Sequence, residues 1–269
     1  MDLLLATALK AADASAEVHL RHFGNVGVGN ATEKGKSDFV SEVDLEAQAA
    51  AIDVIRDAYP HHHVLAEEGD ASLNRDWPPS GEFLWILDPL DGTTNFLHRH
   101  PMFCASVAVG RSGILEAGAV VAPVTQERWW GRRGQGAWKN GERISVSGID
   151  SLQKALVGTG FPFKEPEIIP RFLAQMGRVL PNSGGIRRCG SAALDLCYLA
   201  EGILDAFWEE DYLSPWDCAA GFLILQEAGG VASRLDGSPV DLANGSILAA
   251  NSGELKEELA ALLQVKPEQ

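Results

Sequence analysis

The sequence predicts an α/β protein, with an α+β N-terminal half and an α/β C-terminal half. Three observations support this class. Two segments with apolar residues at helical spacing fill much of the first 60 residues. Short apolar segments of strand length follow them, and beyond about residue 155 strand-like and helical segments alternate. We therefore expect two parts, residues 1–147 and 148–269.

The N-terminal half is expected to begin with two helices. The first covers residues 2–22, and the second opens at Ser41 and ends before Pro60. Between them, residues 24–38 are rich in glycine, asparagine and lysine, which predicts a mobile loop. We expect His61–His63 on the surface, because hard cations prefer oxygen ligands and three consecutive side chains cannot all point one way.

Strands are expected beyond a polar loop at residues 69–82. In the N-terminal half they are the segments FLWILD, FCASVAVG, ILEAGAVVAP and ERWWGRRGQGAWKNGERISVS. The last contains Asn140-Gly141 between alternating segments, which predicts a hairpin. The C-terminal half has the short strands ALVGTG, LDAFWE and ILAAN, which alternate with helices. Two of these helices end at a glycine.

Charge and cysteine content limit the partners and the compartment. The net charge of −15 argues against a broad nucleic-acid or anionic-membrane surface, because both need an excess of Lys and Arg. The four cysteines have no paired spacing and are expected to be buried free thiols of a reducing compartment. No apolar run approaches the ~20 residues of a membrane span, and no basic segment precedes the first apolar run. We expect a cytoplasmic protein without membrane or direct nucleic-acid partners.

An apolar strand segment runs directly into Asp88-Pro89-Leu90-Asp91-Gly92-Thr93-Thr94. Pro89 stiffens the turn, so that the two carboxylates can aim at one place, and the Leu90 carbonyl is available as another oxygen ligand. Gly92 allows a ligand to approach the backbone, and the amides and hydroxyls behind it can donate to an anion. Acids for a cation beside donors for an anion indicate a metal-phosphate site.

Other acids lie at the ends of expected elements. Glu67 and Glu68 follow an apolar pair, and Asp217 begins a helix. Each acid has an ordinary explanation, such as a turn for Asp91, a helix-dipole contact for Asp217 and a solvated loop for the glutamates. Together, five carboxylates from three distant segments are typical of a Mg²⁺ site, because Mg²⁺ prefers oxygen ligands.

These motifs resemble the inositol monophosphatase family, over nearly the whole chain. The matching segments are KGKSDFVSEVD, AEEG, WILDPLDGTTNF, GRRGQGAWKNGERISVS, GTGFPF, RRCGSAALDLCYLAEG and EEDYLSPWDCAAGFLILQEAGG. The resemblance implies a layered αβαβα sandwich of the sugar-phosphatase type. It also implies two or three Mg²⁺ ions, inhibition by Li⁺ and by the larger Ca²⁺, and a homodimer.

The resemblance assigns roles to individual residues. It implies that Asp44, Thr93 and Glu68 position the attacking water, although Asp44 also suits a helix-capping pair with Ser41. The implied metal ligands are Glu67, Asp88, the carbonyl of Leu90, Asp91 and Asp217. The implied substrate contacts are Asp91, Gly92, Thr93, Ser191, Ala193, Glu210 and Asp217, with Lys34 and Arg187 near the site.

The function that this resemblance implies is Mg²⁺-dependent hydrolysis of a small polyol phosphate by metal-activated water. Inositol 1-phosphate is the expected substrate. The alternatives are histidinol phosphate, fructose 1,6-bisphosphate and a nucleotide 3′-phosphate, since Glu210 could meet either hydroxyls or an amine. A non-catalytic regulator on the same fold is the alternative from another class. The complete acid set argues against loss of catalysis, and Cys189 and Cys218 are expected to be structural.

Overall fold

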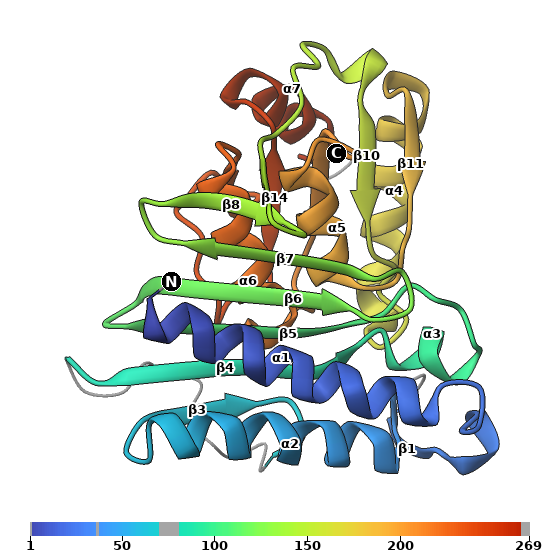
Figure 1. Ribbon diagram of the computed structural model, residues 1–269. Helices are drawn as coiled ribbons and strands as arrows, with labels where there is room; N and C mark the ends of the chain where they lie inside the picture. Colours follow the sequence, from blue (N-terminus) through green and yellow to red (C-terminus); the bar gives the residue numbers. More distant parts are fainter. Residues whose placement is uncertain (1, 36–37, 70–80, 265–269) are drawn as a thin grey trace.

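Helices and sheets alternate in five layers in the computed structural model, which describes residues 2–35, 38–69 and 81–264 (Figure 1). A pair of helices covers one face of a large sheet, and a second pair separates that sheet from a smaller one. A third pair covers the outer face of the smaller sheet. This arrangement confirms the α/β class and the αβαβα layering that the sequence predicts.

The larger sheet has seven strands in the described residues, and they lie in chain order. The first two strands are parallel, and every later neighbour is antiparallel, including the hairpin at Asn140-Gly141. The strands are β3 (His63–Ala66), β4 (Phe83–Asp91), β5 (Cys104–Arg111), β6 (Ile114–Ala122), β7 (Glu127–Arg132), β8 (Gly136–Lys139) and β9 (Glu142–Ile144).

Side-chain alternation along β4 decides which residues face which layer. Trp85 and Leu87 pack under α1 (Leu3–His22) and α2 (Glu42–Ala58), the helices of the first layer. Leu84 and Ile86 point to the opposite face, toward the middle layer. Continuing the alternation places Asp88 on the middle-layer face, at the end of a strand whose preceding residues are apolar.

The middle layer consists of α5 (Ala192–Ala200) and α6 (Pro215–Glu227). Every residue of α5 is buried, including Asp195, and the other residues are mostly apolar, as expected for a helix packed on all sides. Helix α6 lies very close to the larger sheet at two paired glycines, Gly118 and Gly131. A Cβ on Gly118 would lie 3.1 Å from Ala220 Cα, and one on Gly131 would lie 3.3 Å from the Cα of Ile224. The glycine pair therefore sets the depth of α6, whose first turn carries Asp217.

The smaller sheet has the order β11-β10-β12-β14-β13. Its strands are β11 (Gly185–Arg187), β10 (Leu156–Thr159), β12 (Ala206–Glu209), β14 (Ile247–Ala250) and β13 (Val231–Ser233). Helices α4 (Ile169–Val179) and α7 (Gly253–Leu263) cover its outer face, where Phe172 stacks on Trp208. The division at residue 147 stays a prediction, because one apolar cluster continues from the larger sheet through α5 and α6 to the smaller sheet.

Several elements differ from the sequence-based expectations. The expected mobile loop at residues 24–38 contains β1 (Thr32–Gly35), which pairs with β2 (Asp38–Val40), because backbone pairing outweighs the loop-like composition there. Strands β3, β11 and β13 were not expected, since three or four residues are too few to show a periodic pattern.

The expectation that all three histidines lie on the surface is wrong for His62. Its ring stacks between Tyr59 and Phe83, with centroids 4.4 and 4.9 Å away, and its Nδ1 accepts a hydrogen bond from Trp85 Nε1 at 3.1 Å. His61 and His63 are exposed as expected. The four cysteines are free thiols, and no described helix combines the length and apolar character needed to cross a membrane.

Candidate active site

The turn between β4 and α3 (Thr93–Leu97) interrupts the β4–β5 ladder. Asp88 pairs with Ser106 and Asp91 with Cys104, so two residues of β4 bulge opposite one residue of β5. The Leu90 amide donates to Asp88 Oδ1 at 2.9 Å. Gly92 has a φ of 95°, and a Cβ there would lie 2.9 Å from the carbonyl oxygen of Met102, so glycine is required.

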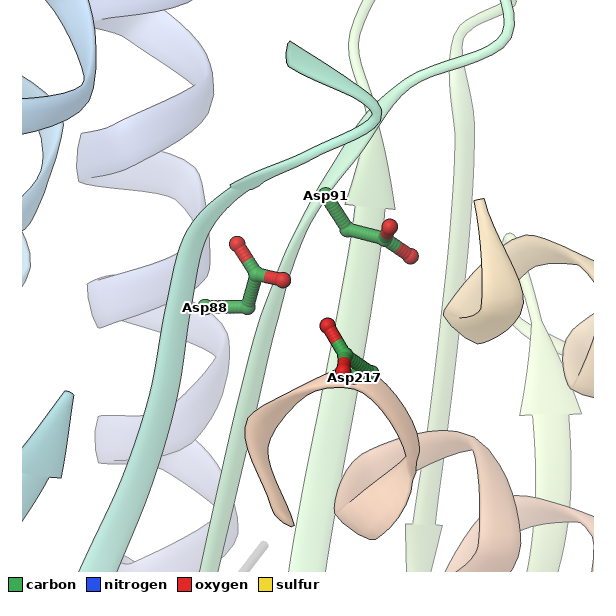
Figure 2. A group of neighbouring side chains, drawn as sticks. All are labelled: Asp88, Asp91 and Asp217. Carbon is green, nitrogen blue, oxygen red and sulfur yellow. The ribbon is translucent and has the colours of Figure 1, made fainter. Parts of the chain in front are cut away.

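Asp88, Asp91 and Asp217 point toward one another, although they come from distant parts of the chain (Figure 2). One carboxylate oxygen of each lies within 4.8 Å of those of the other two. Asp217 is held in the first turn of α6 by a capping box, in which the Ser214 amide donates to Asp217 Oδ2 at 2.5 Å. The first-turn explanation for Asp217 and its place in an acid cluster are therefore both correct.

Burial makes the charged forms of these acids unfavourable. Burial and the negative charges of Glu67 and Asp91 raise the pKa of Asp88 well above its usual range. Burial raises the pKa of Asp91 to about 6, even though hydrogen bonds from Ser191 and Ala193 lower it. A bound cation would reverse both shifts, because it would stabilise the carboxylates.

Asp91 also joins the two halves of the chain. The Ser191 hydroxyl donates to Asp91 Oδ2 at 2.6 Å, and the Ala193 amide donates to the same oxygen at 2.9 Å. Ser191 is the N-cap of α5, so the beginning of that helix orients the carboxylate. Both bonds use Asp91 Oδ2, so Asp91 Oδ1 could bind a metal. The amide of Ala193 is already used as a donor to Asp91.

Asp44 is both a helix cap and a partner of Thr93. Its Oδ2 accepts hydrogen bonds from the Ser41 amide at 2.8 Å and from the Ser41 hydroxyl at 2.7 Å. Its Oδ1 lies 2.9 Å from Thr93 Oγ1, and that hydroxyl also lies 3.1 Å from the Leu90 carbonyl oxygen. Because the cap fixes Asp44, it also fixes the direction in which the Thr93 hydroxyl points.

Glu67 and Glu68 follow β3 beside this turn. The Glu67 amide donates to the carbonyl of Leu87 at 3.1 Å, and the Glu67 carboxyl group interacts with Asp88. The Glu68 amide donates to Gln48 Oε1 at 2.9 Å, and its carbonyl accepts from the Gln48 side chain. Strand β3 lies parallel to β4, and this pairing brings Glu67 to the same sheet edge as Asp88.

A cavity of about 180 Å³ opens above the three aspartates. Its floor and one side are lined by Glu67, Asp88, Leu90, Asp91, Gly92, Thr93, Ser191 and Asp217, all of which the sequence predicts as site residues. Four of these residues carry carboxylates and Leu90 has a backbone carbonyl, and such oxygen donors suit Mg²⁺. The residues present therefore fit a hard cation.

Comparison with known proteins identifies the fold family. The family model described as "Inositol monophosphatase family" matches residues 1–268. The chain belongs to the inositol monophosphatase family.

Similar proteins cover nearly the full length. The chain is 42% identical over 264 residues to "Nus factor SuhB" of Pseudomonas aeruginosa, a match that covers 97% of this chain and 96% of that protein. The crystal structure of extragenic suppressor protein suhB from Bartonella henselae superposes with a TM-score of 0.89 at 33% identity, covering 98% and 99% of the two chains. An inositol monophosphatase from Anabaena (Nostoc) gives a TM-score of 0.82 at 34% identity, covering 98% and 96%. Family and fold are those of metal-dependent phosphatases.

Within this inositol monophosphatase fold, Glu210 lies outside the cavity, contrary to the prediction. Its carboxylate accepts from the Gln175 amide at 2.6 Å and from Arg171, both on α4. Glu209 lines the cavity instead. Side chains alternate along β12, so Glu209 faces the middle layer with Phe207, whereas Glu210 faces α4.

Arg187 is a second correction. Its side chain is exposed, donates to the Ile186 carbonyl at 2.9 Å, and does not line the cavity, whereas the next residue, Arg188, does. The side chain of Lys34 lies outside the described residues. Phe161 and Phe163 also line the cavity, and the GTGFPF motif was the available signal for them.

Two further residues hold the Asp88–Asp91 turn, and nothing in their local sequence predicts this role. His19 of α1 is fully buried, and its Nε2 donates to the Pro89 carbonyl at 2.7 Å, which anchors the bulge from outside the sheet. Burial lowers the pKa of His19 to about 4, so its ring is neutral. The Asn95 amide donates to the carbonyls of Met102 at 2.6 Å and Cys189 at 2.9 Å, and so ties α3 to the segment before α5.

Proposed function

We propose that this protein is a Mg²⁺-dependent phosphomonoesterase that hydrolyses a small polyol phosphate, with inositol 1-phosphate as its substrate. The cluster of Asp88, Asp91 and Asp217 carries the proposal. Buried carboxylates at such short range repel one another, so a site of this kind is unfavourable unless a cation binds to it. Membership in a family of metal-dependent phosphatases supports this interpretation.

The residues that would hold two or three Mg²⁺ ions are Glu67, Asp88, Asp91, Asp217 and the carbonyl of Leu90. When bound, Mg²⁺ would supply positive charge to the phosphate and the leaving alkoxide and would lower the pKa of a water molecule. The Leu90 carbonyl oxygen lies 3.1 Å from Thr93 Oγ1, and its lone pairs remain for a metal when the single Thr93 proton is donated to Asp44.

Thr93 and Asp44 would orient the attacking water. Because the Thr93 hydroxyl donates to Asp44 Oδ1, the lone pairs of Oγ1 point away from Asp44 and can accept a proton from water. Asp44 is buried, and burial raises its pKa, so it can accept that proton through Thr93. Glu68 would assist from the neighbouring loop. The phosphate itself would meet the backbone at Gly92 and Thr93.

The leaving group would lie toward the smaller sheet, near Ser191 and Glu209. Gly160 opposite Glu209 has no room for a Cβ, which would collide with the Glu209 carboxylate. Histidinol phosphate, fructose 1,6-bisphosphate and a nucleotide 3′-phosphate are the alternative substrates, because a carboxylate can accept from either a hydroxyl or an ammonium group.

A phosphate-release assay on a panel of these esters tests the proposal. We expect the highest kcat/KM for inositol 1-phosphate, no activity in excess EDTA, and inhibition by Li⁺ and by Ca²⁺. Full activity in EDTA would contradict the metal assignment. A preference for histidinol phosphate would change the substrate and leave the reaction class intact.

A binding role is the second candidate, and the name "Nus factor SuhB" of several relatives favours it. On this proposal the protein would be a cytoplasmic homodimer that also joins a larger assembly. The substitution Asp91→Asn separates the two candidates, because it should abolish hydrolysis. If the variant still complements a strain that lacks the gene, the cell needs the protein for binding rather than for hydrolysis. The net charge of −15 makes direct nucleic-acid contact unfavourable in such an assembly.

A further inference from the structure

Arg188 has an unusual environment for an arginine in an acidic protein. It is exposed and lines the cavity that holds Asp88, Asp91 and Asp217. Yet within the described residues it forms no ion pair and no hydrogen bond. Its five N–H donors therefore remain available to a ligand.

Two aromatic rings hold the guanidinium in place. Its Cζ lies 5.5 Å from the centroid of the Phe161 ring and 5.3 Å from that of Phe163, and the two rings meet edge to face. Cation–π contacts of this kind are favourable, and they orient the guanidinium without using its N–H groups. Phe161 also packs against Phe172 of α4, which gives the pair a rigid support.

The guanidinium lies against the backbone of Gly190, which lies close to Gly92. A Cβ on Gly190 would collide with Arg188 Nη1, so the guanidinium lies directly against the Gly190 backbone. The carbonyl oxygen of Gly190 in turn would lie 3.3 Å from a Cβ on Gly92, the first residue of the Gly-Thr turn. Arg188 therefore lies next to Gly190, and Gly190 lies next to the Gly-Thr turn, whose backbone would bind the phosphate.

We propose that Arg188 binds the phosphate group of the substrate, and that Phe161 and Phe163 are the positioning residues that present it. Arginine suits this role because its planar fork can bind two phosphate oxygens at once. The inference rests on the proposed phosphatase function and extends it. Metal ions would neutralise the carboxylates, and Arg188 would add a further positive charge to the same cavity.

Arg187 offers a matched control, because it is the adjacent arginine but does not line the cavity. The variants Arg188→Gln, Arg188→Lys and Arg187→Gln are compared first by the shift in melting temperature that inorganic phosphate causes in saturating MgCl₂. This measurement needs no turnover. We expect Arg188→Gln to weaken phosphate binding at least roughly tenfold, the scale of a lost hydrogen bond to a charged group. Arg188→Lys should retain part of the binding, and Arg187→Gln should match the wild type.

Kinetics supply the second readout. Arg188→Gln should raise KM and the inhibition constant of phosphate more than it lowers kcat, because the contact exists in both ground and transition states. Phe161→Leu should produce a smaller change in the same direction. Equal phosphate affinity in Arg188→Gln and Arg187→Gln would overturn the inference, as would a wild type that phosphate does not stabilise. So would a KM effect confined to esters with a second anionic group. If Arg188→Gln weakens phosphate binding but no ester is hydrolysed, the proposed function fails, and Arg188 stands as a ligand of inorganic phosphate alone.

Discussion

Two carboxylate clusters of this protein differ in whether a lysine or arginine neutralises their charge. Glu127 and Glu201 share Lys139, whose Nζ lies 2.7 Å from an oxygen of each, and the Tyr198 hydroxyl donates to Glu127 at 3.3 Å. In the candidate active site, neither Asp88 nor Asp91 forms an ion pair with a described Lys or Arg. Both aspartates are nevertheless almost completely buried.

The comparison shows how an ion-paired acid cluster differs from the acid cluster of the candidate active site. Burial alone would lower the pKa of Lys139, but its bonds to Glu127 and Glu201 raise it, so that cluster carries its own counter-charge. Asp88 and Asp91 form no such ion pair with a described Lys or Arg, so a cation from solution would stabilise their charged forms most effectively. Buried acids that form no ion pair, beside a cavity, are therefore the better indication of function.

The largest effect should come from neutralising one acid in each cluster. Asp91→Asn should abolish turnover and raise the melting temperature in EDTA, because it removes repulsion within the aspartate cluster. Glu201→Gln should leave turnover intact and lower the melting temperature, because it weakens a satisfied pair. Phosphate release and thermal scans of both variants test this reversal. An Asp91→Asn protein with near wild-type rates would show that the metal assignment is wrong.

The second prediction separates chemistry from metal binding within the active site. Thr93→Ala should lower kcat by about 10²-fold or more, the scale of a positioned proton-transfer group. The melting-temperature increase caused by Mg²⁺ should persist, since the aspartates are unchanged. Loss of that increase in the variant would place Thr93 with the metal ligands rather than with the water.

The third prediction concerns pH. Burial raises the pKa of Asp91 to about 6 and that of Asp195 to about 8, against roughly 3.9 in the unfolded chain. Between about pH 4 and pH 8 these two acids bind more protons in the folded metal-free protein than in the unfolded chain, so their contribution makes the free energy of unfolding fall as pH rises. His19, with its pKa lowered to about 4, opposes this contribution below about pH 6.5, so the fall should be steepest above that pH. Each such proton contributes at most about 1.4 kcal/mol per pH unit.

Urea unfolding in EDTA from pH 5 to pH 8 measures this slope. Saturating Mg²⁺ should flatten it below pH 7, because bound metal keeps Asp91 ionised in the folded state. If the free energy of unfolding of the metal-free protein instead rises with pH, Asp91 and Asp195 are ionised in the folded state and other groups stabilise their charges.

The smallest effect should distinguish the two adjacent glutamates. Glu209→Gln should raise KM for the preferred polyol phosphate several-fold, up to about tenfold, with little change in kcat, because it contacts the leaving group in both ground and transition states. Glu210→Gln should leave KM unchanged, since its partners are Arg171 and Gln175. Glycerol 2-phosphate serves as the control substrate. The opposite ranking of the two variants would restore Glu210 as the substrate contact.

The sequence by itself determined the features that depend on near neighbours in the chain. The Asp88–Asp91 turn, the Ser41–Asp44 cap and the Asn140-Gly141 hairpin are each set by turn or capping chemistry within a few residues. The major helices also follow from their periodic apolar positions. Each of these features was predicted because its physical cause lies inside a short window of sequence.

Only the tertiary structure decided which of two adjacent residues enters the site. Glu209 rather than Glu210, and Arg188 rather than Arg187, line the cavity, because neighbouring side chains in extended backbone point in opposite directions and an error of one residue reverses them. The bond from His19 to Pro89 spans 70 positions, and no local pattern records it. Packing of distant elements, rather than local preference, placed these groups around the aspartates.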